Sequence, residues 1–289
     1  MTDSHPETIG EYRILEWMGT SRLGEVYRAR DSRVGRTVEI DVLPGAIAGD
    51  PRTREPFLAA ARRSAALSHP NIAALHEIGE EGSRVYLVRE FVPGTTLNAL
   101  VGGRPLNPRR AIDLAIEIAD ALADAHASGV AHGALDTDAI VVTPKGHAKV
   151  HDLGLAAWAC PTPALTSPAT DPVRADIAAL GAVLFEMLTG EPPAAGARLP
   201  GVIIQAIPAE VDPVVARAIG EGARYESAAA LAADLRAVAA VVDARKNTSA
   251  AVLAPSLRPR RTRVRRARVT ALVVLALLAG LVWWYVRIG

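Results

Sequence analysis

Cysteine is nearly absent from this sequence, and neither sign of charge is in excess. The 289 residues include one cysteine, Cys160, so no internal disulfide can form, and no group of Cys and His has metal-ligand spacing. The 32 basic and 31 acidic residues nearly cancel, so the chain as a whole gives no electrostatic case for nucleic acid or an acidic substrate. These absences exclude a disulfide scaffold and a zinc site, and they favour a reducing compartment.

The N-terminus lacks an apolar run, whereas the C-terminal region contains one. Residues 1–10 are polar, which predicts that no secretory signal is present. Residues 269–286 carry no charge and would span about 27 Å as a helix, which is enough to cross a bilayer. The alternative, a buried core helix, needs a companion domain to cover it, so we expect a transmembrane helix.

Arginines precede this apolar segment, and aromatic residues end it. They are Arg258, Arg260, Arg261, Arg263, Arg265, Arg266 and Arg268, then Trp283, Trp284 and Tyr285. Because basic residues stay on the cytoplasmic side, we expect a single-pass protein of the cell membrane, its large domain cytoplasmic and its C-terminus outside. An arginine run can also bind nucleic acid. Beside an apolar segment, however, it favours anionic lipid, and we predict no nucleic-acid partner.

The order of strand and helix signals predicts two lobes. Short β-branched runs broken by glycine fill residues 12–90, with one helical stretch at 51–67. The elements expected after residue 97 are a hairpin at 140–150 and helices at 107–128, 171–189 and 227–242. The polar stretch 243–268 is rich in Pro, Ser and Arg, which predicts a flexible linker.

Motifs in a fixed order resemble those of bacterial serine/threonine protein kinases. Gly19, Gly24 and Val26 match the first and third glycines and the valine of the glycine-rich loop that covers the nucleotide in that family. The later matches are a turn at 68–72, the hinge at Glu90 and Phe91, the catalytic loop at His132 and Leu135, the metal-binding motif at 152–154, the activation segment at 162–169, the central helix at Asp176, and the late arginine at Arg224.

The resemblance implies a two-lobed α+β protein kinase fold over residues 12–242. The N-lobe is expected at 12–91 and the helical C-lobe at 95–242. The linker 243–268 and a single transmembrane helix, 269–286, are expected to follow.

Positions that the resemblance assigns to catalysis carry residues unsuited to it. The phosphate-binding lysine is replaced by Asp41, and its partner glutamate by Ala60. The proton-accepting aspartate is Ala134, and the metal-binding asparagine is Ala139. Glu39 lies where the family has a small residue above the adenine. Two carboxylates facing a triphosphate repel it by roughly 4 kcal/mol per pair at about 4 Å. We therefore expect no catalytic residues, a pseudokinase, and a chain that is not an enzyme.

Several matching residues survive, and the resemblance gives them remnant or structural roles. The glycine-rich loop and the hinge are a remnant nucleotide site, and Asp152 is a remnant metal ligand, expected to be unoccupied because one ligand makes a poor magnesium site. His132 and Asp176 are expected to be structural. Arg89 stands where the family has an apolar residue behind the adenine. It either pairs with Glu39 or Asp41, or it is solvated, and the sequence leaves these open.

The sequence thus favours a membrane-anchored pseudokinase of bacterial signalling that acts as a protein-interaction, scaffold or regulatory domain. Its protein partner is unknown, with an active kinase or a membrane protein as candidates. The alternative is an atypical serine/threonine kinase, with Asp136 or Asp138 as the base, or an ATP-binding switch. ATP and Mg²⁺ are expected only under that alternative, and nucleotide affinity discriminates between the two.

Overall fold

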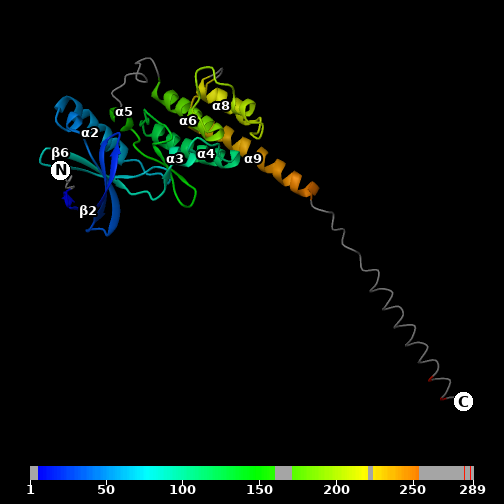
Figure 1. The fold of residues 1–289 in the computed structure, drawn as a ribbon, viewed down its shortest axis with the longest axis horizontal. Coiled ribbons are helices and arrows are strands. Elements are labelled where there is room, and N and C mark those ends of the chain that lie inside the picture. Colours follow the sequence, from blue (N-terminus) through cyan, green and yellow to red (C-terminus); the bar gives the residue numbers. More distant parts are fainter. Residues whose placement is uncertain (1–5, 160–170, 221–223, 254–282, 284–286, 288–289) are drawn as a thin grey trace. The chain divides into compact units, whose positions relative to one another are not determined.

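The computed structural model describes residues 6–159, 171–220, 224–253, 283 and 287. The chain divides into two compact units, Met1–Val242 and Asp243–Gly289. The first unit holds both lobes. Its strand-rich half comes first along the chain and its helical half second, which agrees with the predicted α+β order (Figure 1).

The N-lobe is an antiparallel sheet with two helices. The sheet has the order β1-β2-β3-β4-β6-β5. Its strands are β1 (Thr8–Ile9), β2 (Tyr12–Ser21), β3 (Gly24–Asp31), β4 (Arg36–Val42), β5 (Leu75–Glu81) and β6 (Arg84–Glu90), and its helices are α1 (Gly45–Ala48) and α2 (Pro51–Ala65). Helix α2 starts where Asp50 accepts a hydrogen bond from the Arg52 N–H and Pro51 fixes the first turn. Its buried face, which includes Phe57, packs in an apolar cluster with Leu87 of the sheet.

The C-lobe is built around two long helices. Its elements are β7 (Thr95–Thr96), α3 (Leu97–Val101), α4 (Pro108–Ala127), β8 (Ile140–Val142), β9 (Ala148–Val150), α5 (Ala156–Ala159), α6 (Pro172–Thr189), α7 (Pro200–Ile203), α8 (Val211–Ile219) and α9 (Ala228–Leu253). Asn107 and Asp171 cap the starts of α4 and α6, which lie where the sequence predicted helices at 107–128 and 171–189. Gly181 of α6 lies so close to α8 that an added Cβ would be 2.7 Å from the Ala218 Cβ. This close approach fixes α8 against α6.

The C-terminal unit differs in part from the expectation. Helix α9 continues beyond residue 242 to Leu253, so the stretch expected as a linker, 243–268, begins as helix. Within the described part of the chain, no helix has the length and apolar character to cross a bilayer. The expected span, 269–286, lies outside the described residues except for Trp283, and so does the arginine run before it. Arg287 lies over the Trp283 ring, 4.7 Å from its centroid.

Candidate active site in the cleft between the lobes

The turn between β2 and β3 carries the glycine-rich motif. Gly24 has φ +140°, and an added Cβ would meet the Val42 carbonyl oxygen at 1.9 Å, so only glycine fits there. The Ser21 hydroxyl accepts from the Leu23 N–H at 3.1 Å and donates to the Asp41 carboxylate at 2.9 Å. The turn is thereby tied to β4, whose side chains form the next part of the site.

Neighbouring strands place three charged side chains on one face of the sheet. Glu39 and Asp41 are two residues apart on β4, so they point to the same side. Arg89 of β6 lies directly opposite Glu39 in the antiparallel register. Strand pairing therefore brings Arg89 to the two acids of β4, although it lies about 50 residues further along the chain.

Arg89 is the centre of a buried ion-pair cluster. Its Nε is 2.6 Å from the Asp41 carboxylate and 3.4 Å from that of Glu39, and its other nitrogens contact Asp41 and Asp152. The arginine side chain is 6% exposed and that of Asp41 is fully buried. The structure therefore decides the question that the sequence left open: Arg89 pairs with both Glu39 and Asp41. Arg89 also pairs with Asp152, a partner that the sequence did not predict.

One guanidinium cannot neutralise three carboxylates, and the pKa values reflect this imbalance. Burial, with the nearby Asp41 and Asp152 charges, raises the pKa of Glu39 to about 7 in spite of Arg89. Burial would also raise the pKa of Asp152, but the Arg89 guanidinium in contact with it holds that pKa below its ordinary value. Burial lowers the pKa of His151, the neighbour of Asp152, to about 4. Burial, with the Asp152 charge, also raises the pKa of Asp41 in spite of Arg89, so the excess negative charge favours the protonated form of both Glu39 and Asp41.

Asp152 was expected to be a remnant metal ligand, and in the structure its carboxylate pairs with Arg89. In the described residues, no group of three or more His, Cys, Asp or Glu side chains is arranged to hold a metal ion. Ala139, where the family's second ligand would stand, is buried at 5% exposure and offers no oxygen from its side chain. The donors present in this conformation therefore do not fit Mg²⁺, which prefers several oxygen ligands.

The catalytic loop is held by residues that the sequence assigned to structure. The buried Asp176 carboxylate accepts hydrogen bonds from the backbone N–H groups of His132 (2.7 Å) and Gly133 (2.9 Å), and it contacts His126 Nε2 at 2.8 Å. His132 is fully buried, and its Nε2 lies 3.1 Å from the His151 carbonyl oxygen. Burial lowers the pKa of His132, so it is neutral at physiological pH. Both residues have the structural roles expected.

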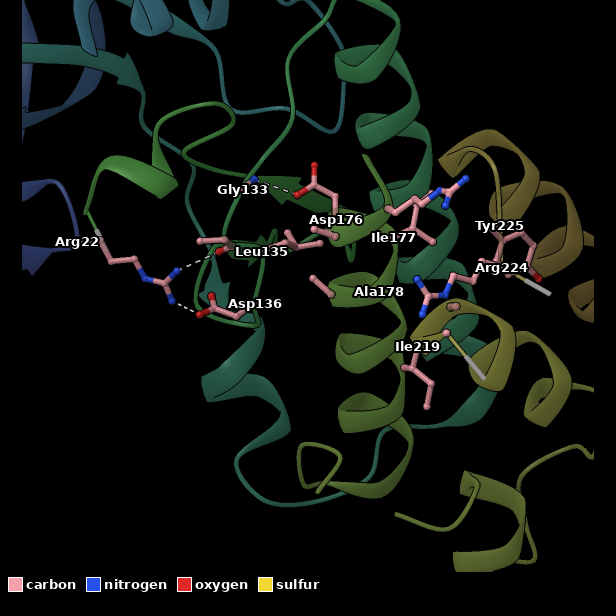
Figure 2. A pocket seen from close by; sticks show the side chains of 16 residues that line it. Arg22, Gly133, Leu135, Asp136, Asp176, Ile177, Ala178, Ile219, Arg224 and Tyr225 are labelled. Carbon is pink, nitrogen blue, oxygen red and sulfur yellow. Dashed lines mark hydrogen bonds and ion pairs between the residues drawn. The ribbon is translucent and has the colours of Figure 1, made fainter. Parts of the chain in front are cut away.

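A second arginine joins the two lobes at the glycine-rich turn. Arg22 donates to the Ala134 carbonyl oxygen at 3.1 Å and contacts the Asp136 carboxylate (Figure 2). Asp136 also accepts from the backbone N–H groups of Asp138 and Ala139, both at 3.1 Å. Sequence reasoning missed this contact. Two features of the sequence could have indicated it. Asp136 stands where the family has a lysine, and Arg22 lies in the glycine-rich turn, so the two positions carry opposite charges.

The remaining positions that the resemblance assigns to the cleft make other contacts. Ala60 is buried in α2, and Glu90 of the hinge pairs with Lys149 at 2.8 Å. At the hinge end of the cleft, Arg28 lies over the Phe91 ring, 5.7 Å from its centroid, and pairs with Glu16 at 3.1 Å. The activation segment at 162–169 is outside the described residues.

Comparison with known proteins identifies the family of this architecture. The protein kinase domain model matches residues 12–173. Serine/threonine-protein kinase PknA of Mycobacterium tuberculosis is 35% identical over 212 residues, covering 65% of this chain and 48% of PknA. PknB of Mycobacterium leprae is 31% identical over 268 residues, covering 80% of this chain and 43% of PknB. The chain spans about half the length of the curated relatives it matches.

The fold itself is found among solved kinases. The crystal structure of the PknI kinase domain of Mycobacterium tuberculosis matches with a TM-score of 0.69 at 24% identity, covering 79% of this chain and 96% of that one. This likeness confirms the two-lobed kinase fold.

These matches correct one expectation. The prediction that the chain is not an enzyme is contradicted, because the matching model is a protein kinase domain and the relatives named are serine/threonine kinases at 31–35% identity. The prediction was based on the residues found at individual catalytic positions, each considered separately. Phosphoryl transfer depends mainly on positioning and electrostatics supplied by many groups together, so substitutions at single positions do not identify a non-enzyme. Neither the pseudokinase assignment nor the membrane anchor gains support from the matches.

Proposed function

The chain belongs to the protein kinase domain family, and we propose that it is an atypical serine/threonine protein kinase domain held in a closed state by two N-lobe arginines. The observation that carries this proposal is the Arg89 guanidinium in contact with both Asp41 and Asp152. Arg89 occupies the place where phosphate and its metal ion would meet the protein. Nucleotide can enter only when this contact opens.

The second arginine supports the same proposal from the opposite lobe. Arg22 neutralises Asp136, one of the two acids considered as a replacement base. Asp138 is exposed, and its carboxylate accepts from the Asn98 side-chain amide at 2.8 Å. Arg22 and Arg89 thus each pair with a carboxylate that a kinase reaction would need free. A kinase that is closed until regulated explains why the chain has carboxylates at positions 136 and 152 and why each is paired with an arginine.

The closed conformation does not fit magnesium and ATP, so no phosphoryl-transfer step is derived for it. The state that opens would release Asp152 as a metal ligand and Asp136 as a proton acceptor. Because the usual base is missing at Ala134, we expect turnover below the roughly 1–100 s⁻¹ typical of kinases by a factor of about 10² to 10⁴.

The test compares the full chain with variants that open each contact. We expect slow transfer of phosphate from ATP to casein or to the chain itself, measured by mass spectrometry. Arg22→Ala should raise this rate at least about tenfold, since it frees Asp136 at a modest cost in stability. Asp152→Asn and Asp136→Asn should each abolish it.

A paired substitution tests the Arg89 contact without leaving its acids uncompensated. Arg89→Met combined with Asp41→Lys keeps one cation in the cluster and restores a phosphate-binding lysine. It should tighten magnesium-ATP binding at least tenfold, or about 1.4 kcal/mol, in calorimetry. Arg52→Ala, an exposed site on α2, is the matched control and should change nothing. If folded wild type and Arg22→Ala both transfer no phosphate, the proposal is wrong.

The second candidate is a protein-interaction domain of kinase fold. The observation that favours it is the presence of ion pairs at positions of the kinase cleft: Arg28 lies over Phe91 of the hinge and pairs with Glu16, and Arg89 pairs with Asp152. Cross-linking in cells would then recover the same partners from wild type and from Asp152→Asn. Loss of those partners in Asp152→Asn alone would favour the kinase.

We also propose that residues 269–286 anchor the domain in the cell membrane with the kinase domain cytoplasmic. The uncharged run and the arginines that precede it support this. We expect those arginines to bind anionic lipid. A reporter fused after Gly289 should be exposed outside the cell, and removal of residues 269–289 should release the domain from membranes. A reporter found inside would contradict the proposal.

A further inference from the structure

A cavity of about 700 Å³ opens where the chain leaves the hinge, at Pro93. Its other walls come from the turn after α2, the middle of α4 and the β8–β9 hairpin. The volume falls within the range of about 300–1,000 Å³ that ligand sites occupy. The lining residues all belong to 6–159, which the structure describes without a gap, and none of them is part of the catalytic loop or the Arg89 cluster.

Hydrogen bonds hold the walls of this cavity in place. The Asn71 side-chain amide donates to the Ala148 carbonyl oxygen at 2.8 Å, and the Val150 N–H donates to the Asn71 carbonyl oxygen at 2.8 Å. The Glu117 carboxylate accepts from the Ala148 N–H at 2.6 Å and lies 2.7 Å from His147 Nδ1. Both the turn after α2 and helix α4 are thus tied to the same hairpin, so the cavity is formed before any ligand binds.

The lining is mainly apolar, and part of it is rigid. Three of its residues are the exposed prolines Pro70, Pro93 and Pro144. Proline has a fixed φ and no N–H that needs a partner, so these walls lose little conformational entropy when a ligand covers them. Such a cavity suits a large apolar side chain of another molecule, because that side chain leaves water when it enters.

Two of the three lysines of the chain line this cavity, although the sequence has 32 basic residues. Lys149 pairs with Glu90 at 2.8 Å, so its charge is already matched. Lys145 is exposed, and no side chain that the structure describes forms an ion pair or hydrogen bond with it. Because a lysine has an apolar stem and a terminal ammonium, Lys145 adds apolar surface to the cavity and an unmatched cation beside it.

Acids of the chain do not neutralise Lys145. Among the described residues that line the cavity, Glu117 alone is acidic, and its carboxylate is bound by His147 and the Ala148 N–H. The segments 160–170 and 254–289 contain neither Asp nor Glu, and the second is rich in arginine. An apolar group that carries a complementary carboxylate therefore has to come from another molecule.

We propose that this cavity docks a segment of a partner protein in which a large apolar side chain stands next to a carboxylate. The apolar side chain lies between the prolines, and the carboxylate pairs with Lys145. The charge of Lys145 disfavours the arginine-rich tail of the chain itself, because like charges repel. The cavity is separate from the nucleotide cleft, so this inference holds whether or not the chain transfers phosphate.

The probe is the N-acetylated peptide Gly-Leu-Phe-Glu-Asp-Gly with fluorescein at its C-terminus, titrated with the full chain in fluorescence anisotropy at about 50 mM salt. We expect saturable binding with a Kd of about 10–500 μM. Replacement of Phe by Ala, or of Glu and Asp by Gln and Asn, should each weaken binding at least about tenfold. Affinity should also fall as salt rises, because an exposed ion pair is screened.

Variants locate the binding. Lys145→Glu should weaken it at least about tenfold, whereas Lys145→Arg should bind nearly as wild type does. Pro70→Ala combined with Pro93→Ala should weaken it about fivefold with the salt dependence unchanged, because apolar surface and not charge is removed. Lys246→Glu, in α9 and the second unit, makes the same change of net charge and is the matched control that should bind as wild type does.

Acetylation of lysine gives a second measurement, because the chain has only three lysines to follow. The acetyl ester of N-hydroxysuccinimide transfers its acetyl group to a lysine Nζ, which loses a proton as N-hydroxysuccinimide leaves. Mass spectrometry reads each lysine separately. Saturating peptide should slow the acetylation of Lys145 at least about threefold and leave that of Lys246 unchanged.

Three results would overturn the proposal. One is no binding below about 1 mM, another is equal binding by Lys145→Glu and Lys246→Glu, and the third is acetylation of Lys145 at the same rate with and without peptide. Sedimentation of the full chain tests whether the occupant is a second copy. A dimer that Lys145→Glu dissociates would show that the partner assignment is wrong.

Discussion

The carboxylate of Asp176 and the carboxylates around Arg89 are both buried beside the cleft, yet they are neutralised in different ways. Asp176 accepts from the backbone N–H groups of His132 and Gly133. Asp41 and Asp152 depend on one guanidinium. Backbone donors are fixed by the fold and cannot be withdrawn while it stands. A side-chain cation can rotate away.

This difference separates a structural site from one that can switch. The Asp176 site holds the catalytic loop in every state in which the domain is folded. The Arg89 cluster has an alternative, because a lysine introduced at position 41 could supply a cation to the remaining acids. The following experiments test that separation.

The largest effect is expected from Arg89→Met. It leaves Asp41, Glu39 and Asp152 buried without a cation, and breaking a buried ion pair from one side costs about 3–5 kcal/mol. Urea unfolding of the full chain at pH 7.5 should show this loss. Arg84→Met, at an exposed position on the same strand, should stay within about 0.5 kcal/mol of wild type. A loss below about 1 kcal/mol for Arg89→Met would mean that the cluster is not buried in solution.

Asp176→Ala should cost about 3 kcal/mol, because two buried backbone N–H groups lose their acceptor at about 1–3 kcal/mol each. Asp176→Asn keeps one oxygen acceptor and should recover part of the stability. If Asp41→Lys restores stability to Arg89→Met but not to Asp176→Ala, the comparison is confirmed. If it restores both or neither, the distinction between the two sites fails.

Glu39 should make the folded state less stable as pH rises, whereas a carboxylate with a lowered pKa makes it more stable. Its folded pKa of about 7 lies above the ordinary 4.5, so the folded state holds the proton more tightly. The contribution of Glu39 to the free energy of unfolding is fully present below about pH 4.5. It is lost as pH rises to 7 and beyond, and the loss is at most about 3 kcal/mol.

Glu39→Gln isolates this effect, because the variant keeps Arg89, Asp41, Asp152 and His151. The difference in free energy of unfolding between wild type and Glu39→Gln should favour wild type more at pH 5 than at pH 8. Thermal unfolding at both values measures it. A difference that is constant with pH would show that Glu39 is ionised throughout.

The smallest effect on stability is expected from Arg22→Ala. The Arg22 and Asp136 side chains are 29% and 42% exposed, so their pairing contributes about 0–1 kcal/mol. Amide hydrogen exchange at residues 19–24 should nevertheless become faster, because the turn loses its contact with the catalytic loop. Unchanged exchange in that turn would mean that Ser21 and Asp41 alone hold it.

Much of the fold could be read from the sequence because its signals are local. The sequence predicted helices at 107–128 and 171–189, and α4 and α6 occupy these ranges almost residue for residue. The structural roles of His132 and Asp176 followed from motif order. Helix α9 was underestimated, because the Pro- and Arg-rich composition further along the chain was extended back over residues that are helical.

The sequence by itself determined which charged residues stand at each position of the cleft, and hence that Asp41 and Glu39 needed a cation. It could not choose between a paired and a solvated Arg89. That choice belongs to the tertiary structure: the register of β4 against β6 places Arg89 opposite Glu39, and the loop after β9 brings Asp152 to the same guanidinium. Contacts between residues so far apart in sequence depend on the packing of both lobes, and no local pattern encodes them.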